Sequence, residues 1–119
     1  MKNFPKDPDR DYSLSNAEIA ISSELWKREI YGVESQKKFW KLITVADFYI
    51  ADVNLAVFID GEQVHQNKEL QDSSKRDFVR SQGCTVRVYT YKAPLTKKRL
   101  TEIVDQIVDD VIGLRKMRQ

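Results

Sequence analysis

Two apolar segments joined by only four residues are the feature that most restricts the fold of this chain. They cover residues 44–50 and 55–60, and both are rich in β-branched and aromatic residues, which favour strands. The link between them, Ala51-Asp52-Val53-Asn54, is long enough for a tight connection and too short for a crossover helix. The sequence therefore predicts an antiparallel pair of strands, the second of which ends at Gly61.

A helix and one more strand are expected before this pair. Ser15, followed three residues later by Glu18, forms a capping-box pattern ahead of apolar residues at helical spacing. This pattern predicts a helix over residues 17–31, ended by Gly32. The β-branched and aromatic residues that follow indicate a strand over residues 35–40.

A helix, a strand and a final helix are expected after the pair. Residues 67–82 are mostly polar and suit a surface helix, with Gly83 at the position of a C′ glycine. Residues 84–91 alternate as a strand does, and Thr96 can cap a last helix over residues 96–117. In the strand, one face is formed by Val86 and Val88 and the other by Arg87 and Tyr89. In the last helix, the apolar residues recur at helical spacing: Leu100, Ile103, Val104, Ile107, Val108, Val111 and Ile112.

These elements predict one domain of the α/β (α+β) class in the order α-β-β-β-α-β-α. The short link makes the second and third strands antiparallel, and the helical crossover brings the fourth strand in parallel, giving a mixed sheet of about four strands flanked by helices. A chain of 119 residues has the length of a single domain. Residues 15–117 are expected to form it, behind a flexible leader over residues 1–14.

Composition excludes several classes of protein and of site. Apolar runs long enough for a membrane span are missing, and the polar amino end is unlike a signal peptide, so the expected location is cytosolic (intracellular), with no membrane partner. The single cysteine, Cys84, excludes an internal disulfide, and together with the single histidine, His65, it excludes a zinc site built from cysteine and histidine. The net charge of +2 argues against a protein that holds nucleic acid by bulk charge.

Polar groups gather at the ends of the two apolar strands. Asp47 interrupts the second strand, Asp60 closes the third, and His65 follows. In a hairpin the two aspartates lie toward the same end of the sheet, where two carboxylates and an imidazole suit a magnesium ion beside a general base. Each residue also has a structural explanation: a solvated strand aspartate, an Asp60-Gly61 turn, a surface histidine. Spacing alone leaves the choice open.

At this point the sequence resembles a known family. Three segments look like the core of very-short-patch-repair (Vsr-like) endonucleases of the PD-(D/E)XK superfamily. They are Asp47-Phe48-Tyr49, Leu55 to Gly61, and His65. The later residues Asp72, Lys75-Arg76 and Gly83 to Val88 are similar to the helix and strand that end that core. The nearest group by this resemblance is the EDxHD homing endonucleases, and the resemblance covers roughly residues 15–92.

The resemblance implies a restriction-endonuclease-like fold and a metal-dependent DNA endonuclease, an endodeoxyribonuclease that hydrolyses phosphodiester bonds. By position, Asp47 would bind the metal and His65 would be the general base. Asp72 would orient the histidine or the surroundings of the scissile phosphate, and Glu18 would hold a metal-bound water. The spacing before Asp47 is loose in the family, which leaves two alternatives to Glu18: Glu24 and Glu29.

Two departures from the family pattern bear on the site. The acidic position of the (D/E)XK strand falls at Phe58 or Ile59, so by analogy with Vsr-like members the Ile59 backbone carbonyl would be a metal ligand, with Asp60 helping. The implied ion is Mg²⁺, with Mn²⁺ as a substitute and no zinc. The cysteines and histidines that hold a structural zinc in mismatch-repair relatives are missing, which puts mismatch specificity in doubt. The alternatives are a catalytically inactive nucleic-acid-binding module of the same fold and a restriction-type or junction-type nuclease.

The expected partner is double-stranded DNA. Basic residues cluster beside the proposed site and could contact phosphates, although each also suits a solvated surface. They are Lys37, Lys38, Lys41, Lys68, Lys75, Arg76 and Arg80. The low net charge predicts that sequence recognition comes from another domain or subunit. Five apolar residues of the last helix follow heptad order and have two interpretations. They form part of the core, or they form the seam of a homodimer. They are Leu100, Val104, Ile107, Val111 and Leu114.

Overall fold

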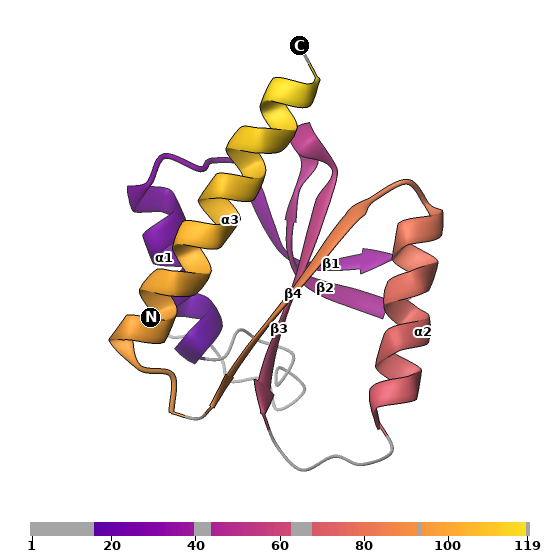
Figure 1. Cartoon of the computed structure of the whole chain (residues 1–119), viewed down its shortest axis with the longest axis horizontal. Helices are drawn as coiled ribbons and strands as arrows, with labels where there is room; N and C mark the ends of the chain where they lie inside the picture. Colours follow the sequence, from indigo (N-terminus) through magenta and orange to yellow (C-terminus); the bar gives the residue numbers. More distant parts are fainter. Residues whose placement is uncertain (1–15, 40–43, 63–67, 93, 119) are drawn as a thin grey trace, which may run out of the picture.

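Four strands form one mixed sheet in the order β1-β2-β3-β4, with helices on both of its faces (Figure 1). The structure is a computed structural model, and it describes residues 16–39, 44–62, 68–92 and 94–118. The elements of this part are α1 (Asn16–Lys27), β1 (Val33–Phe39), β2 (Thr44–Ile50), the 3₁₀ turn η2 (Ala51–Val53), β3 (Leu55–Glu62), α2 (Lys68–Ser81), β4 (Thr85–Lys92) and α3 (Lys97–Met117). The predicted order of helices and strands is confirmed.

The strands pair as the chain connections require. β1 pairs with β2 and β2 with β3 in antiparallel register, while β4 returns parallel to β3 through α2. The β3–β4 register extends over eight pairs, from Leu55↔Thr85 to Glu62↔Lys92, but the β2–β3 register has only three, from Phe48↔Val57 to Ile50↔Leu55. The central pair of strands is therefore joined only at the end next to η2.

Each face of the sheet has its own apolar cluster. The larger cluster lies under α1 and α3, and the smaller one lies under α2, on opposite sides of the sheet in Figure 1. The buried members of the first are Ile21, Leu25, Ile30, Phe48, Ile50, Val53, Leu55, Val57, Ile59, Tyr89, Ile103, Val104, Ile107 and Val111. Those of the second are Ala46, Ala56, Phe58, Val79 and Val86. The predicted alternation along β4 is confirmed, since Val86 and Val88 pack in the α2 cluster and Tyr89 packs in the other.

The first helix ends four residues earlier than the sequence predicts. Glu29 adopts a left-handed backbone, with φ of 65°. The Glu29 amide donates to the Trp26 carbonyl, and the Ile30 amide donates to the Leu25 carbonyl, both at 2.9 Å. This is the Schellman arrangement, which here places Ile30 against Leu25 in the core. The prediction that Gly32 ends the helix is wrong because Glu29 takes the C′ position that is usually glycine's.

The remaining boundaries differ from the prediction by a few residues. Gly61 does not end β3, which continues to Glu62 beside β4. Gly61 instead allows a close approach, because a Cβ atom on it would lie 3.0 Å from the Tyr91 hydroxyl. β1 begins two residues before the predicted start. Gly83 has the positive φ, 92°, of a C′ glycine after α2, as predicted.

The last helix is capped and buried as its sequence pattern indicates. The Thr96 side chain accepts from the Arg99 amide at 3.1 Å. Val104, Ile107 and Val111 are fully buried against the sheet, and two further residues of the stripe pack at the edge of the same cluster: Leu100 and Leu114. The domain's own core thus includes these residues of the predicted heptad seam, and the homodimer stays a prediction.

Two sequence expectations concern segments outside the described residues: the leader over residues 1–14 and the Ser15 cap. Across the part of the chain that the structure describes, no helix is both long enough and apolar enough to cross a membrane.

Candidate functional site

A bend in the β1–β2 ribbon builds the candidate site. The register between these strands includes Ser35↔Phe48 and Lys37↔Ala46 but omits the pair between them, Gln36 and Asp47. Gln36 has a φ of 56°, in the left-handed region, which is costly for a residue with a Cβ. The two strands therefore change direction together at this position.

The bend changes which side of the sheet the β2 side chains face. Ala46 and Phe48 are two residues apart and would share a face in a regular strand. Instead, Ala46 packs in the α2 cluster and Phe48 packs in the cluster under α1 and α3. Asp47 lies between them, so its carboxylate enters the space where β2 separates from β3.

The Asp47 carboxylate takes the place of a strand partner for β3. Its Oδ2 accepts the Ile59 amide at 2.6 Å, just beyond the last register pair of β2 with β3. An unpaired buried amide would cost about 1–3 kcal/mol, which this bond avoids. We call the opening between β2 and β3 at Asp47 and Ile59 the fork.

Glu18 brings a second carboxyl group into the fork from α1. Its side chain is hydrogen-bonded to the Asp47 side chain, and its Oε1 also accepts from Gln36 Nε2 at 3.3 Å. A hydrogen bond between two carboxyl groups requires a proton on one of them. The carboxyl groups of Glu18 and Asp47 are therefore linked by a proton, while Gln36 donates to Glu18 from β1.

The environment holds that proton on Asp47. Burial raises the pKa of the Asp47 carboxyl to about 8, and the hydrogen bond with Glu18 and the charges of Glu18 and Asp60 act in the same direction. The Ile59 amide opposes this shift because it donates to the ionised form. A cation entering the fork would therefore compete with the proton that this raised pKa favours on Asp47.

The backbone of Ile59 also faces the fork. In an extended strand, the N–H and C=O of one residue point to the same side. Because the Ile59 amide donates to Asp47, its carbonyl also points toward β2, away from β4. The Ile59 side chain packs under α1 and α3, and Phe58 faces α2. Apolar side chains thus occupy both positions at which the resemblance places the acid of the (D/E)XK strand.

Asp60, which follows Ile59 on β3, is paired with an arginine of α2. Its Oδ2 accepts from Arg76 on α2 at 2.5 Å. The negative charge of Asp60 still contributes to the raised pKa of Asp47, which shows that the two carboxyl groups lie close enough to interact. The sequence prediction that both aspartates lie toward one end of the sheet is confirmed, while the role of Asp60 as a ligand stays a prediction.

The other predicted catalytic residues are placed in part. His65 lies outside the described residues. Asp72 belongs to α2, but its side chain is outside the described part of the chain. Of the alternatives to Glu18, Glu24 pairs with Lys27 at 3.3 Å and Glu29 forms the end of α1. Glu18 is the glutamate of α1 that contacts Asp47.

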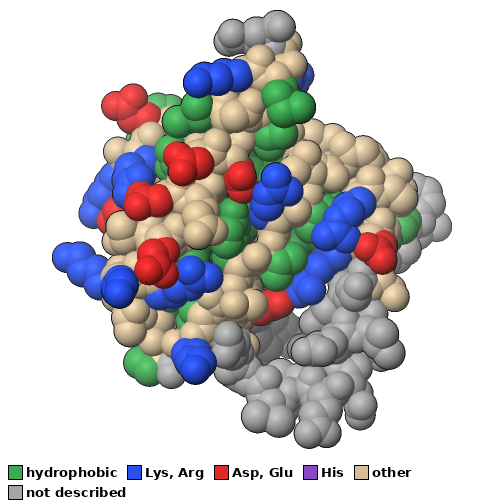
Figure 2. Space-filling view, viewed as in Figure 1, with side chains coloured by type: hydrophobic (Ala, Val, Ile, Leu, Met, Phe, Trp, Pro, Cys, Tyr) green, Lys and Arg blue, Asp and Glu red, His purple; other side chains and the backbone are tan. Residues whose placement is uncertain are grey.

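The basic residues predicted to contact DNA have different surroundings. Lys38 and Lys75 are exposed. Lys37 lies over the Tyr49 ring, and Arg80 pairs with Asp77 at 2.7 Å. Arg76 is enclosed, and two lysines are outside the described side chains: Lys41 and Lys68. On the face in Figure 2, acidic and basic side chains mix over α3, and basic ones predominate along the boundary of β4 and α2.

The donor set of the fork fits a hard cation in kind. Carboxylate and carbonyl oxygens, here from Glu18, Asp47 and Ile59, are the ligands that magnesium takes in proteins. Within the described residues, no three aspartate, glutamate, histidine or cysteine side chains gather closely enough to hold a metal ion. A complete cation site would therefore use the Ile59 carbonyl and water beside the two carboxylates.

Sequence reasoning missed Gln36 and did not predict the contact of Arg76 with Asp60. Gln36 carried no signal, since glutamine is not a residue type that favours a positive φ. Arg76 lies four residues after Asp72 on α2, and its spacing from Asp60 gives no indication of their contact.

No family model, curated protein or solved structure matches this chain.

Proposed function

We propose that this chain is a metal-dependent DNA endonuclease domain with a Vsr-like, restriction-endonuclease-like fold, the catalytic part of a homing or mobile-element enzyme. One observation carries the proposal: the carboxyl groups of Asp47 and Glu18 meet in a sheet opening whose other wall is the backbone of Ile59. These are two of the four residues to which the motif resemblance assigns catalytic roles, and they come from separate elements of the fold.

The chain's own residues would divide the work of phosphodiester hydrolysis. Asp47 and the Ile59 carbonyl would hold Mg²⁺ or Mn²⁺, and Glu18 would orient a water in the fork. The bound ion would stabilise negative charge on the phosphoryl oxygens. His65, whose side chain type titrates near neutral pH, would take the proton of the attacking water, and Asp72 would orient it.

Substrate binding would depend on exposed basic residues of α2 and β1. Lys38, Lys75 and Arg80 are exposed and would contact phosphates of double-stranded DNA. With a net charge of +2, this domain would bind weakly by itself, and another domain or subunit would supply sequence recognition inside the cell.

The second candidate is a non-catalytic nucleic-acid-binding module of the same fold. Phe58 favours it, because an apolar ring packed under α2 stands where the superfamily has an acid. The restriction-type or junction-type nuclease shares the chemistry of the first candidate and differs from it in the substrate.

A plasmid-cleavage assay tests the proposal. Supercoiled plasmid is incubated with the full chain and Mg²⁺ or Mn²⁺, and nicked and linear products are quantified. Asp47→Asn and His65→Ala are expected to remove cleavage. Glu24→Gln is the matched control, because Glu24 lies on the same helix as Glu18 and pairs with Lys27 at the surface.

Each outcome separates the candidates. Cleavage that Asp47→Asn and His65→Ala lose and Glu24→Gln keeps supports the endonuclease. DNA binding without cleavage under either metal supports the non-catalytic module. Full activity of His65→Ala with loss in Asp47→Asn rejects the general-base role of His65. Preference for four-way junctions over linear duplex supports the junction-type enzyme.

A further inference from the structure

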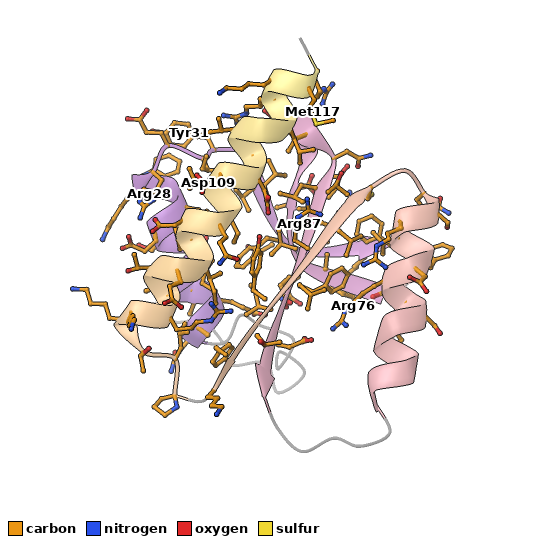
Figure 3. The ribbon with its side chains drawn as sticks, viewed as in Figure 1. Arg28, Tyr31, Arg76, Arg87, Asp109 and Met117 are labelled. Carbon is orange, nitrogen blue, oxygen red and sulfur yellow. The ribbon has the colours of Figure 1, made fainter. Side chains whose placement is uncertain are left out.

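Arg76 is unusually enclosed for a surface-helix arginine. Its side chain is 18% exposed, the lowest value among the arginines that form ion pairs in the described part of the chain. Arg80, one turn later on the same helix, is 51% exposed. Figure 3 shows Arg76 between α2 and the strands.

Among the described residues, Arg76 contacts side chains of β3. Its guanidinium donates to Asp60 Oδ2 at 2.5 Å and stacks over the Phe58 ring, with 5.7 Å from Cζ to the ring centroid. Its Nε is buried and has no hydrogen-bond partner among the described residues. A guanidinium on an aromatic face, paired with a carboxylate, is well stabilised only while it stays in that place.

This arrangement does not suit a phosphate contact. To reach DNA, Arg76 would have to leave both Phe58 and Asp60, and the aspartate would then be left unpaired beside the Asp47–Glu18 pair. The Asp60 side chain is 41% exposed, so breaking this pair costs less than breaking a fully buried one, but more than losing a surface pair such as Arg80 with Asp77.

We propose that Arg76 is a positioning residue: it ties Asp60, near the end of β3, to α2 and fixes that carboxylate at the fork. This revises the sequence prediction that Arg76 contacts DNA. Asp60 and Gly61 follow Ile59 directly, so the ion pair also fixes the backbone whose amide and carbonyl face Asp47. The positioning role of Arg76 does not depend on the proposed function. Only the DNA-binding and cleavage readouts rest on the proposed function.

Nuclear magnetic resonance tests the positioning role without DNA. The full chain is labelled, and the Ile59 amide and Asp60 carboxyl signals are compared in wild type, Arg76→Gln and Arg80→Gln. Arg76→Gln is expected to shift both signals, and Arg80→Gln to leave them in place. Arg76→Lys, which keeps the charge, serves as a second variant if Arg76→Gln unfolds.

Binding and kinetics provide the functional readout. Arg80→Gln is expected to lower the slope of log affinity against log salt by about one unit, as the loss of one phosphate contact does. Arg76→Gln is expected to keep the wild-type slope and KM but lower kcat about tenfold, and Arg76→Lys to recover part of kcat.

The outcomes separate this proposal from the proposed function. A reduced salt slope in Arg76→Gln, with unshifted Ile59 and Asp60 signals, overturns the positioning role. If wild type neither binds nor cuts DNA, the endonuclease proposal fails, and the two signals alone decide the role of Arg76. Arg76→Gln and Arg76→Lys could also lose kcat equally and in proportion to their loss of thermal stability. That result would assign Arg76 only to docking α2 on the sheet, and it would also overturn the positioning role.

Discussion

The carboxyl groups of Asp47 and Glu18 are hydrogen-bonded to each other across the gap between a strand and a helix. Such a pair is stable only with a bound proton or a bound cation, because two ionised carboxylates in contact repel each other. The contact therefore favours a proton on Asp47 that a solvated aspartate would lose at neutral pH. Its consequences can be measured in stability as well as in activity.

The first prediction concerns stability against pH. The pKa of Asp47 is about 8 in the folded state and about 3.9 in an unfolded chain, so the folded state binds the extra proton between these values. Stability is then fully present below pH 4 and falls as pH rises toward 8. Asp47→Asn keeps an acceptor for Ile59 and cannot ionise, so its stability relative to wild type should rise with pH, by up to about 1.4 kcal/mol for each pH unit between 5 and 8.

Urea unfolding at pH 5, 6.5 and 8 measures this difference. Asp105→Asn, at an exposed carboxylate on α3 that pairs with Arg28, is the control and should keep the wild-type slope. Parallel pH profiles for wild type and Asp47→Asn would contradict a proton held on Asp47.

The second prediction concerns Glu18. In wild type, the negative charge of Glu18 and its hydrogen bond each raise the pKa of Asp47. Glu18→Gln removes the charge and changes the hydrogen bond. The pKa of Asp47 should fall, but it should stay above its ordinary value because burial, the largest cause, remains. Carbon-13 titration of the Asp47 carboxyl measures the change. Glu24→Gln should leave the titration of Asp47 as in wild type, and an unchanged titration in Glu18→Gln would refute the contact.

The third prediction concerns the bend at Gln36. A β-branched residue is strained at a positive φ, so Gln36→Val should destabilise the fold by about 2 kcal/mol, while Gln36→Gly should be nearly neutral. Ser35→Val, at the neighbouring exposed position, is the control and should be neutral or stabilising. Chemical denaturation measures all three. A Gln36→Val variant as stable as wild type would show that Gln36 is extended in solution.

The fourth prediction concerns the apolar stripe of α3. Ile107 is fully buried, so Ile107→Ala should cost about 2–5 kcal/mol, while Ile112→Ala, at an exposed position of the same helix, should cost little. Both unfolding midpoints should be independent of protein concentration. A midpoint for wild type that rises with concentration would indicate that a dimer stabilises the fold.

Local patterns predicted the elements because each depends on nearby residues. The β2 boundaries, the Thr96 cap and Gly83 follow from β-branched runs, capping and glycine's tolerance of positive φ. The end of α1 was predicted incorrectly because Glu29 adopts a conformation that its residue type disfavours, and burial of Ile30 against Leu25 compensates for it.

The geometry of the candidate site was predictable only in part. Strand pairing explains why Asp47 and Asp60 lie toward one end of the sheet. The contact of Asp47 with Glu18 depends on how α1 packs and on the bend at Gln36, which are properties of the tertiary structure. The enclosure of Arg76 also arises from packing, here against Phe58, and a lysine or arginine in a polar helix looks the same in sequence whether it is enclosed or solvated.

The short β2–β3 register has a mechanical consequence. The sheet consists of two ribbons, β1–β2 and β3–β4, which are joined by three register pairs at one end and by the Asp47–Ile59 hydrogen bond farther along. Widening this end of the sheet breaks one side-chain hydrogen bond and leaves every backbone ladder intact. A cation bound through the other carboxylate oxygen, Oδ1, would leave this hydrogen bond in place, so the fork could be occupied without separating the ribbons.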